Sequence, residues 1–596
     1  MSPAAPHPNS LLGAVAAVQT AAATITSPDS TTPPSPTSTA RDVEQAGSGR
    51  RVAIAASAKE KEAFSETASL ELQDEKSQPI PEVDANLVTW DSDDDQANPM
   101  NWSKKRKWVV TWTVSLFTLM SPISSSMMAP AIPNISYDVG MDPKSVLASM
   151  SLSIFVLAYA VGPLLLGPLS ELMGRTLILQ VSNLMFLVFN IACSQAQTTT
   201  QLLIFRFLAG FGGSAPLAVG GGALSDMFKA EERGAANAIY SMMPLTGPAL
   251  GPIAGGWIAE KVSWRWVFYS TSIADGIVQV MGFFFLRETY APKILGDKAA
   301  RLRKETGNDK LHTIYDRPDR TYRQVVRTGL YRPLEFLLKE PIVQVFACYQ
   351  AALYGLMYLT LTTFAELWTL KYGMSVGIGS LNYIALGLGF YIGAVFAAKM
   401  MDKTYAKLKA QNGGVGTPEM RIPLMIITSF LVPIGLVIYG WTADTIVFWI
   451  VPDIGAMIFC IGIIGAFISI TTYLIDNYTI YSASALAAAA GFRSLAGFGF
   501  PLFANTMFQT LGIGWGNTLC AGIIVLFLPA PWIFYRYGPW LRSRSRYARR
   551  PSPTSTGAPA ASTENPSTSR TVGTRAGSRP LTARYSARVS QVLRSG

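Results

Sequence analysis

The sequence has few of the residues that most often carry chemistry in proteins. Among its 596 residues there are only four cysteines and two histidines, and 15% of the residues are charged. Cys193, Cys348, Cys460 and Cys520 lie one by one in separate apolar segments without a C-x-x-C pair, so neither a metal site nor a disulfide framework is expected. Both histidines lie outside the apolar segments, and any proton coupling would therefore have to use carboxylates.

Signatures of enzymes and of nucleic-acid-binding proteins are missing as well. The loops contain no P-loop, no cluster of metal ligands and no Ser-His-Asp set, so we expect no enzymatic activity and no cofactor. The net charge is +11, but the sequence offers no folded module that would present this charge to a nucleic acid. We therefore expect no nucleic-acid partner.

Long apolar runs are what the sequence has in abundance. Hydrophobic residues make up 49% of the chain, and a membrane-spanning helix needs about 20 mostly apolar residues in succession. Hydropathy predicts roughly a dozen such spans, at residues 108–130, 146–169, 176–195, 201–224, 235–259, 265–287, 342–367, 378–400, 422–441, 446–474, 484–509 and 515–536. The prediction is an all-α integral membrane protein that crosses the lipid bilayer twelve times.

Basic residues predict the direction in which the chain crosses the membrane. The run KKRK at 104–107 precedes the first span, which places the N-terminus in the cytoplasm by the positive-inside rule. Even-numbered loops are richer in Lys and Arg than odd-numbered loops, so both termini are expected to be cytoplasmic. The long basic loop 288–341 divides the spans into a six-helix bundle at 101–287 and a second one at 342–540.

The two ends of the chain have compositions typical of disorder. Residues 1–100 are rich in Pro, Ser, Thr and Ala and end in an acidic run, so they have little to bury and are expected to form a disordered cytoplasmic tail. Residues 541–596 are rich in Arg, Ser and Pro. We expect a second disordered tail there, whose basic charge holds it to anionic lipid.

Proline and glycine recur at a fixed spacing in the segment 244–256, PLTGPALGPIAGG. Prolines 244, 248 and 252 and glycines 247, 251 and 255 each repeat every fourth residue, and so each set stays near one face of a helix. Small residues at this spacing let a second membrane helix approach closely. From the residues alone, a kinked packing helix is as good an explanation as a functional motif.

The same segment resembles the fifth-span antiporter motif of the major facilitator superfamily, G-x-x-x-G-P-x-x-G-G. The residues of the motif are Gly247, Pro248, Gly251, Pro252, Gly255 and Gly256. The stretches 167–175 and 206–215 resemble the family's motifs after the second span and in the fourth span. Those at 287–295 and 480–503 are similar to the fungal branch of twelve-span drug and proton antiporters, which includes multidrug and polyamine exporters.

This resemblance implies a fold and an activity. The fold would be two six-helix bundles that rock about a central site, and the activity would be export of drugs, toxins, secondary metabolites or polyamines in exchange for protons. The protein would be a monomer, driven by the proton gradient without a cofactor. It would lie in the plasma membrane, with the vacuolar membrane as the second choice.

The resemblance also implies a cytoplasmic gate around the loop after the second span. Gly174 permits a tight turn there, and Arg175 can pair with helix ends or with residues of the next loops. The gate residues that we expect are Gly167, Glu171, Gly174, Arg175, Asp226 and Arg233. A solvated turn that obeys the positive-inside rule is the plainer alternative.

Ionisable residues within spans are candidates for proton coupling, because a charge at the bilayer centre costs at least about 2.5 kcal/mol. Arg206 matches the family's fourth-span arginine, and Asp453 lies about a third of the way into the tenth span; we expect the two to face each other. Glu366 could belong to an outer gate or to the membrane interface. Asp275 suits a local hydrogen bond better than proton transfer, and Arg493 suits a structural contact with a helix end.

Three residues of the seventh span could form one wall of a substrate cavity. Gln350, Tyr354 and Tyr358 are four residues apart and share a helix face, which would suit flat or cationic amphiphiles. Such an aromatic stripe is more often used for packing than for binding. Two other activities stay open: a nutrient uniporter or symporter of the same fold, and a transporter-like receptor that signals through its long tails.

Overall fold

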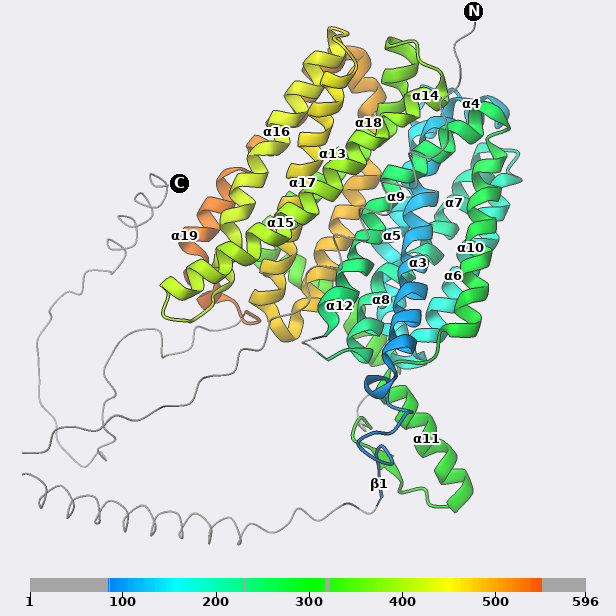
Figure 1. The fold of residues 1–596 in the computed structure, drawn as a ribbon, viewed down its shortest axis with the longest axis vertical. Helices are drawn as coiled ribbons and strands as arrows, with labels where there is room; N and C mark the ends of the chain where they lie inside the picture. Colours follow the sequence, from blue (N-terminus) through cyan, green and yellow to red (C-terminus); the bar gives the residue numbers. More distant parts are fainter. Residues whose placement is uncertain (1–83, 85, 230–231, 317–321, 549–596) are drawn as a thin grey trace, which may run out of the picture. The chain divides into compact units, whose positions relative to one another are not determined.

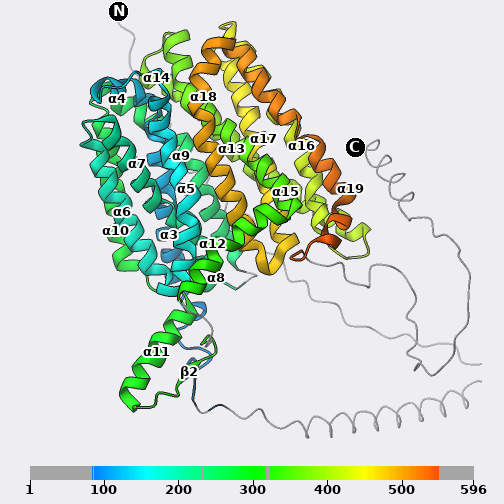
Figure 2. The same ribbon diagram turned by 180° about the vertical axis from the view of Figure 1, so that it is seen from behind.

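The computed structural model describes residues 84, 86–229, 232–316 and 322–548, and most of these residues are helical. Two groups of helices lie side by side (Figures 1 and 2). The N-terminal bundle consists of α3 (Lys104–Met127), α5 (Val146–Met173), α6 (Arg175–Ser194), α7 (Thr199–Gly213), α8 (Ala215–Met227), α9 (Arg233–Lys261) and α10 (Arg265–Phe285). The short α4 (Ile132–Asp138) follows α3 after the turn η2 (Ala129–Ala131).

The C-terminal bundle repeats this arrangement. It consists of α13 (Pro341–Glu366), the turn η3 (Leu367–Lys371), α14 (Val376–Leu381), α15 (Tyr383–Gln411), the turn η4 (Pro418–Arg421), α16 (Ile422–Asp444), α17 (Ile450–Tyr478), the turn η5 (Thr479–Tyr481), α18 (Ser482–Val525) and α19 (Pro529–Arg544). The long α18 contains a break at Gly512, whose φ of 76° and ψ of 172° are not helical. This glycine separates the predicted eleventh and twelfth spans.

All twelve predicted spans are therefore helical. Serine and threonine begin several of these helices: Ser103, Ser145 and Thr198 accept hydrogen bonds from backbone N–H groups in the first turns of α3, α5 and α7, as N-cap residues do. Within the described residues, eight helical segments are long and apolar enough to cross a membrane. The last of them, Ile450–Arg544, holds three predicted spans in one continuous segment.

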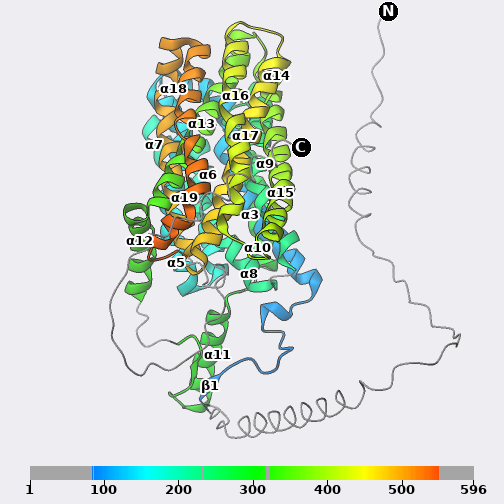
Figure 3. The ribbon, with the colours of Figure 1, turned by 90° about the vertical axis from the view of Figure 1, so that its left-hand side faces the viewer.

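The two ends of the bundles carry different elements. Figure 3 shows α11 (Ala291–Thr306) beyond one end, beside the strand β1 (Leu87–Val88); we call this end the α11 end. The parallel partner of β1 is β2 (His312–Thr313), and α12 (Tyr322–Lys339) lies at the same end of the bundles. The opposite end, which carries α4 and α14, is the α14 end.

The hydrophobic cores show where the bundles are joined. One core contains the C-terminal bundle together with residues of the N-terminal bundle near the α14 end, such as Met127, Leu202 and Phe268. A second core contains only residues of the N-terminal bundle from its half near the α11 end, such as Val114, Phe186 and Leu224. The bundles thus share a core at the α14 end and have separate cores toward the α11 end.

Two predicted tail boundaries differ from the structure. Residues 86–100, expected to belong to the disordered tail, are ordered by the β1–β2 pairing and by the turn η1 (Pro99–Asn101). After residue 540, α19 continues to Arg544, and Tyr547 stacks on Phe336 of α12 with 4.9 Å between ring centroids. These short segments are ordered because they pack on the central loop, which hydropathy does not reveal. The remaining tail residues, 1–83 and 549–596, lie outside the described part.

Candidate functional site

The predicted gate turn is built on a glycine. Gly174 joins α5 to α6 with φ of 98°, in the range that favours glycine. The Glu288 carboxylate accepts hydrogen bonds from the backbone N–H groups of Arg175 (2.9 Å) and Thr176 (3.1 Å). A Cβ at Gly174 would overlap this carboxylate. Glu288 therefore caps the start of α6, where two N–H groups and the helix dipole favour a negative charge.

Arg175 is held by residues of the same bundle. Its Nε lies 3.3 Å from Asp226 Oδ2 at the end of α8, and its Nη1 donates to Ser170 Oγ at 2.8 Å. Its guanidinium carbon lies 4.8 Å from the centre of the Tyr290 ring. All of these contacts lie within the segments around α5, α6 and α8, so in this conformation they tie helices of one bundle together.

The other predicted gate residues lie further out. Glu171 is exposed in the last turn of α5, and Arg233 is exposed in the first turn of α9. A Cβ at Gly167 would meet nothing within 4 Å, so no close packing requires glycine there. Sequence reasoning missed Glu288, although it lies inside the stretch 287–295 that carried part of the family resemblance.

The glycines at 247, 251 and 255 form a close seam between α9 and α3. A Cβ at Gly247 would overlap Pro122, and one at Gly255 would overlap the Met127 carbonyl oxygen. A Cβ at Gly251 would lie 2.9 Å from the Ile123 carbonyl oxygen. Ser126 Oγ donates to the Gly247 carbonyl across the seam at 3.0 Å.

The next part of α9 contacts the other bundle at the α14 end. Gly256 packs on Ser380 of α14 so closely that a Cβ would overlap the Ser380 hydroxyl. One turn later, Glu260 Oε2 accepts a hydrogen bond of 2.6 Å from the Gly377 N–H. Pro248 and Pro252 are buried in the same stretch of α9. The motif therefore joins α9 to its own bundle on one side and helps to close the α14 end on the other.

A polar contact ties α4 to α10 at the same end. Asp138 Oδ2 accepts hydrogen bonds from the Trp264 indole N–H (2.7 Å) and from Arg265 Nη1 (2.8 Å). The Trp264 hydrogen bond, followed by that from Arg265, lowers the pKa of Asp138 below its usual range. The carboxylate thus stays ionised, and the contact stays formed, across the physiological range of pH.

The Arg206 side chain is fully buried, and its hydrogen bonds go to backbone carbonyl groups. Its guanidinium donates to the carbonyls of Ser124 (3.1 Å), Ser125 (3.2 Å) and Ser151 (3.3 Å), and it lies over the Phe155 ring at 4.5 Å. Five donors on one planar group suit such multiple contacts. Arg206 thereby holds α3 and α5 to α7.

The expected approach of Arg206 to Asp453 is not seen. Among the described residues, the two make neither an ion pair nor a hydrogen bond. Asp453 lies in the first turn of α17 at the α14 end and not a third of the way into the span, because the helix begins at Ile450. Its side chain is buried, and Oδ1 has no hydrogen-bond partner among the described residues.

The other two carboxylates of the spans differ in their surroundings. Glu366 is partly buried in the last turn of α13 at the α14 end, and Lys144 is the opposite charge near it. Asp275 is fully buried and accepts hydrogen bonds of 3.1 and 3.2 Å from the Asn183 amide. This is the local hydrogen-bonding arrangement expected for Asp275.

The aromatic row of α13 lies where the two bundles meet. Tyr354 and Tyr358 have ring centroids 5.0 Å apart, and the Tyr358 hydroxyl lies 3.4 Å from Ser125 Oγ of the other bundle. Gln350 is buried and donates to Thr471 Oγ1 of α17 at 3.4 Å. Tyr354 is the partly exposed member of the row, and the other two are buried.

Arg493 lies beside this row and not at a helix end. Its guanidinium carbon is 5.4 Å from the centres of both the Tyr354 and the Phe467 rings. No ion pair or hydrogen bond of Arg493 is found in the described part of the chain. The expected contact with a helix end is therefore not seen among these residues.

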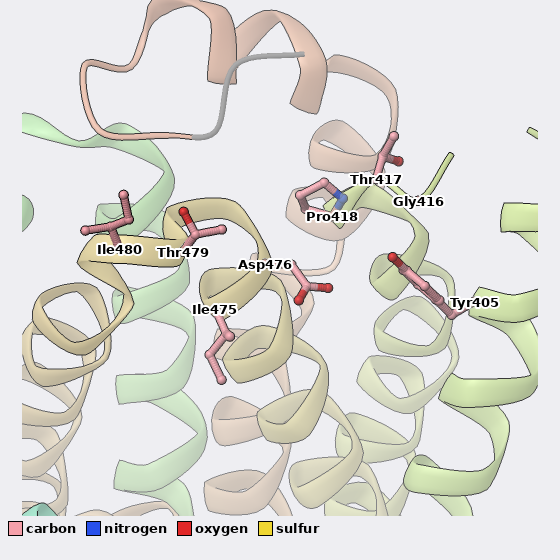
Figure 4. Close-up of a pocket in the computed structure, with 8 residues that line it drawn as sticks. All are labelled: Tyr405, Gly416, Thr417, Pro418, Ile475, Asp476, Thr479 and Ile480. Carbon is pink, nitrogen blue, oxygen red and sulfur yellow. The ribbon is translucent and has the colours of Figure 1, made fainter. Parts of the chain in front are cut away.

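A pocket of about 400 Å³ lies at the α11 end of the C-terminal bundle (Figure 4). It is lined by Tyr405, Gly416, Thr417, Pro418, Ile475, Asp476, Thr479 and Ile480. Asp476 accepts a hydrogen bond of 3.0 Å from Arg421 Nε, and the Arg421 guanidinium lies 4.1 Å from the Tyr405 ring centre.

This pair repeats the Arg175–Asp226 pair of the first bundle. Arg421 immediately precedes the predicted ninth span and pairs with the end of the tenth span, as Arg175 at the start of the third span pairs with Asp226 at the end of the fourth. Such correspondence is expected of two halves related by an internal repeat.

Comparisons with known proteins agree with this architecture. The chain is 48% identical over 466 residues to the efflux pump vrtL of Penicillium aethiopicum, which covers 78% of this chain and 92% of that protein. It is 44% identical over 442 residues to an uncharacterized transporter of Schizosaccharomyces pombe, covering 74% and 90% of the two chains. It is 41% identical over 467 residues to the efflux pump radE of Floropilus chiversii, covering 78% and 86%.

Solved structures share the fold at low identity. The partially occluded, inward-open xylose transporter XylE from E. coli superposes with a TM-score of 0.54 at 16% identity, over 72% of this chain and 99% of that one. The predicted fold of two six-helix bundles is thereby confirmed, and the efflux pumps among the relatives support a multi-pass membrane transporter. Residues 114–501 match the family model of the Major Facilitator Superfamily, and the chain belongs to this family.

Proposed function

We propose that the protein is a proton-coupled antiporter that exports small organic molecules by alternating access. It acts as a monomer in the plasma membrane, with the α11 end in the cytoplasm, and it is driven by the proton gradient. The efflux pumps among its relatives support export. The basic residues at the α11 end support the orientation.

The observation that carries the proposal is the glycine seam between α9 and α3. At Gly247, Gly251 and Gly255 the backbone of α9 lies so close to α3 that a Cβ would overlap it. An antiporter needs such a seal, because a leak of protons or substrate through a bundle would uncouple the two flows. The adjoining contacts of Gly256 and Glu260 with α14 hold the α14 end closed while the α11 end receives substrate.

Asp453 is the proposed proton carrier. It is buried at the end of the bundle that faces the outside in this orientation, and one carboxylate oxygen lacks a partner among the described residues. A proton that arrives from outside neutralises this group and removes the cost of a buried charge. The change in charge then favours the rearrangement that opens or closes the α14 end.

Arg206 has no direct part in this step. It is fully enclosed by carbonyl oxygens of its own bundle and is assigned to holding that bundle rigid. The proton and the substrate are coupled through the shared core at the α14 end and not through an Arg206–Asp453 pair.

Transport in oriented vesicles tests the proposal. Uptake of labelled candidate substrates is measured with and without an imposed pH gradient for wild type, Asp453→Asn and Gly251→Leu/Gly255→Leu. We expect the gradient to drive uptake by wild type only. Gly276→Leu is the control for the glycine variant, because a Cβ at Gly276 meets nothing within 4 Å.

Two results would contradict the proposal. Wild-type flux that ignores the gradient would favour a uniporter, and full gradient-driven transport by Asp453→Asn would exclude that residue as the proton carrier. A receptor that signals through its tails would respond to nutrient in the absence of flux; most of both tails lies outside the described residues.

A further inference from the structure

Arg493 is a cation within a membrane span whose charge is not balanced by a carboxylate in the described part of the chain. Its neighbours are the rings of Tyr354 on α13 and Phe467 on α17, each 5.4 Å from the guanidinium carbon. Nε is buried without a hydrogen-bond partner, while the residue as a whole is partly exposed. The ionisable groups that face it are the hydroxyls of Tyr354 and Tyr358, which are ordinarily neutral near pH 7.

This part of α18 faces the other bundle. Gly497, one turn after Arg493 on the same helix face, is so placed that a Cβ would lie 2.8 Å from Tyr354 and 3.0 Å from Val156 of α5. Helices α13, α17 and α18 of one bundle therefore meet α5 of the other near Arg493. A central site between two rocking bundles is where this fold binds its substrate.

A comparison with Arg206 shows what Arg493 lacks. Both side chains lie within spans, where burying the charge of an arginine is costly. Arg206 regains this cost through three backbone carbonyls. The described residues supply Arg493 with neither a carbonyl nor a carboxylate acceptor. The N–H donors of its planar guanidinium can therefore hydrogen-bond to another molecule.

We propose that Arg493 binds an acidic group of the substrate, so that the transported compounds are organic anions with a flat apolar body. A carboxylate fits the guanidinium fork in a bidentate manner. The Tyr354 and Phe467 rings beside it provide aromatic surface for the rest of the molecule. This inference names the substrate class of the proposed exporter and rests on that function.

The same geometry argues against cationic substrates, which the aromatic row alone would suit. A cation needs the face of an aromatic ring, but the Arg493 guanidinium already lies next to Tyr354 and Phe467 and would repel a second positive charge. The aromatic row and the arginine together favour substrates that carry a negative charge. The cationic amphiphiles that the row alone would suit are therefore not expected as substrates.

Binding of two probes of the same shape tests the assignment. The full chain is purified into lipid nanodiscs, and the affinities of 6-hydroxy-2-naphthoate and of its neutral primary amide are measured. Because a hydrogen-bonded charge contributes about 1.5–3 kcal/mol, wild type should bind the carboxylate about 10- to 100-fold more tightly than the amide. Arg493→Gln should lose this preference and keep its affinity for the amide within about threefold.

Two further variants complete the experiment. Arg493→Lys retains the charge and should keep most of the preference, whereas Arg301→Gln, on the exposed surface of α11, should behave as wild type. Retained amide binding shows that Arg493→Gln is folded. If wild type binds neither probe or both equally, or if Arg493→Gln keeps the preference, the proposal is wrong.

The assay also separates this inference from the proposed function. Binding is measured without a pH gradient, so a failure of proton coupling in vesicles leaves the carboxylate preference unchanged. Conversely, gradient-driven export with no preference for anions would overturn the role of Arg493 alone.

Discussion

A single methyl group at Gly255 should be enough to weaken the seam between α9 and α3. In Gly255→Ala the new Cβ would overlap the Met127 carbonyl oxygen and would lie 2.9 Å from its carbonyl carbon and 3.0 Å from Met127 Cγ. An ordinary contact between carbon and oxygen is about 3.3–3.6 Å. The obstacle is backbone, which cannot rotate away, so the two helices must separate along the seam.

The size of the effect follows from two opposing terms. Overpacking of this kind costs about 1–3 kcal/mol, while replacing glycine by alanine within a helix gains about 0.5–1 kcal/mol. We expect Gly255→Ala to lower the free energy of unfolding by up to about 2.5 kcal/mol, because the overlap is with backbone. Gly276→Ala on α10 has only the favourable term, because its Cβ meets nothing within 4 Å, and it should be neutral or slightly stabilising.

Thermal unfolding of the two variants in the same detergent, followed by fluorescence-detected size exclusion, measures the difference. Vesicles that hold the same proteins report the leak of protons in the absence of substrate. Gly255→Ala should unfold at a lower temperature and leak more than Gly276→Ala. Equal unfolding temperatures and equal leaks would show that the seam is not tight in the membrane and would refute the reasoning.

Three further outcomes are expected. Gly174→Ala should lower the free energy of unfolding by at least about 1–2 kcal/mol, because the position has a positive φ and the new Cβ would overlap Glu288. Gly167→Ala is the control, since a Cβ at Gly167 meets nothing within 4 Å. Equal unfolding temperatures of the two variants would contradict this prediction. Glu419→Gln should destabilise by about 3–5 kcal/mol, because it removes the negative charge from a buried ion pair in which Arg542 Nε and Glu419 Oε1 lie 2.7 Å apart. Thermal unfolding of Glu419→Leu/Arg542→Leu should show a smaller loss. The pKa of Asp138 is lowered in the folded chain, so its contact with Trp264 should persist as pH falls from 8 to about 5. The contact should be lost only below the usual aspartate pKa of about 3.9. A rise in hydrogen exchange of α4 between pH 8 and 5, beyond the intrinsic change with pH, would contradict this prediction.

The sequence was sufficient for the fold because the bilayer imposes a simple rule. A span must be long, apolar and helical, and each of the twelve segments predicted from hydropathy is helical in the structure. The break at Gly512 lies in the predicted gap between the last two spans. Hydropathy could not locate the ordered ends of the tails. The β1–β2 pair and the contact of Tyr547 with α12 are ordered by residues more than 200 positions away, and no local pattern records such partners.

The sequence indicated several residues of the candidate site, but it did not indicate which of them contact one another. Motif resemblance indicated Arg175 and Asp226, which do meet, but it gave no reason to expect Glu288 at the same turn. Hydropathy marks an arginine in a span as costly and cannot say what offsets the cost. Arg206 and Arg493 therefore look alike in the sequence, although three carbonyls surround the first and two aromatic rings the second.

The two charge pairs at the α11 end occupy corresponding positions in the two bundles. Arg175–Asp226 and Arg421–Asp476 each join the start of one span to the end of the next within a single bundle. In this conformation neither pair joins one bundle to the other, whereas α12 packs on both α5 and α18 at this end. A movement that brought the two clusters together would set their arginines against each other, and each paired carboxylate would weaken that repulsion. The ion pairs thus stabilise each bundle and would lower the electrostatic cost of bringing the bundles together at the α11 end.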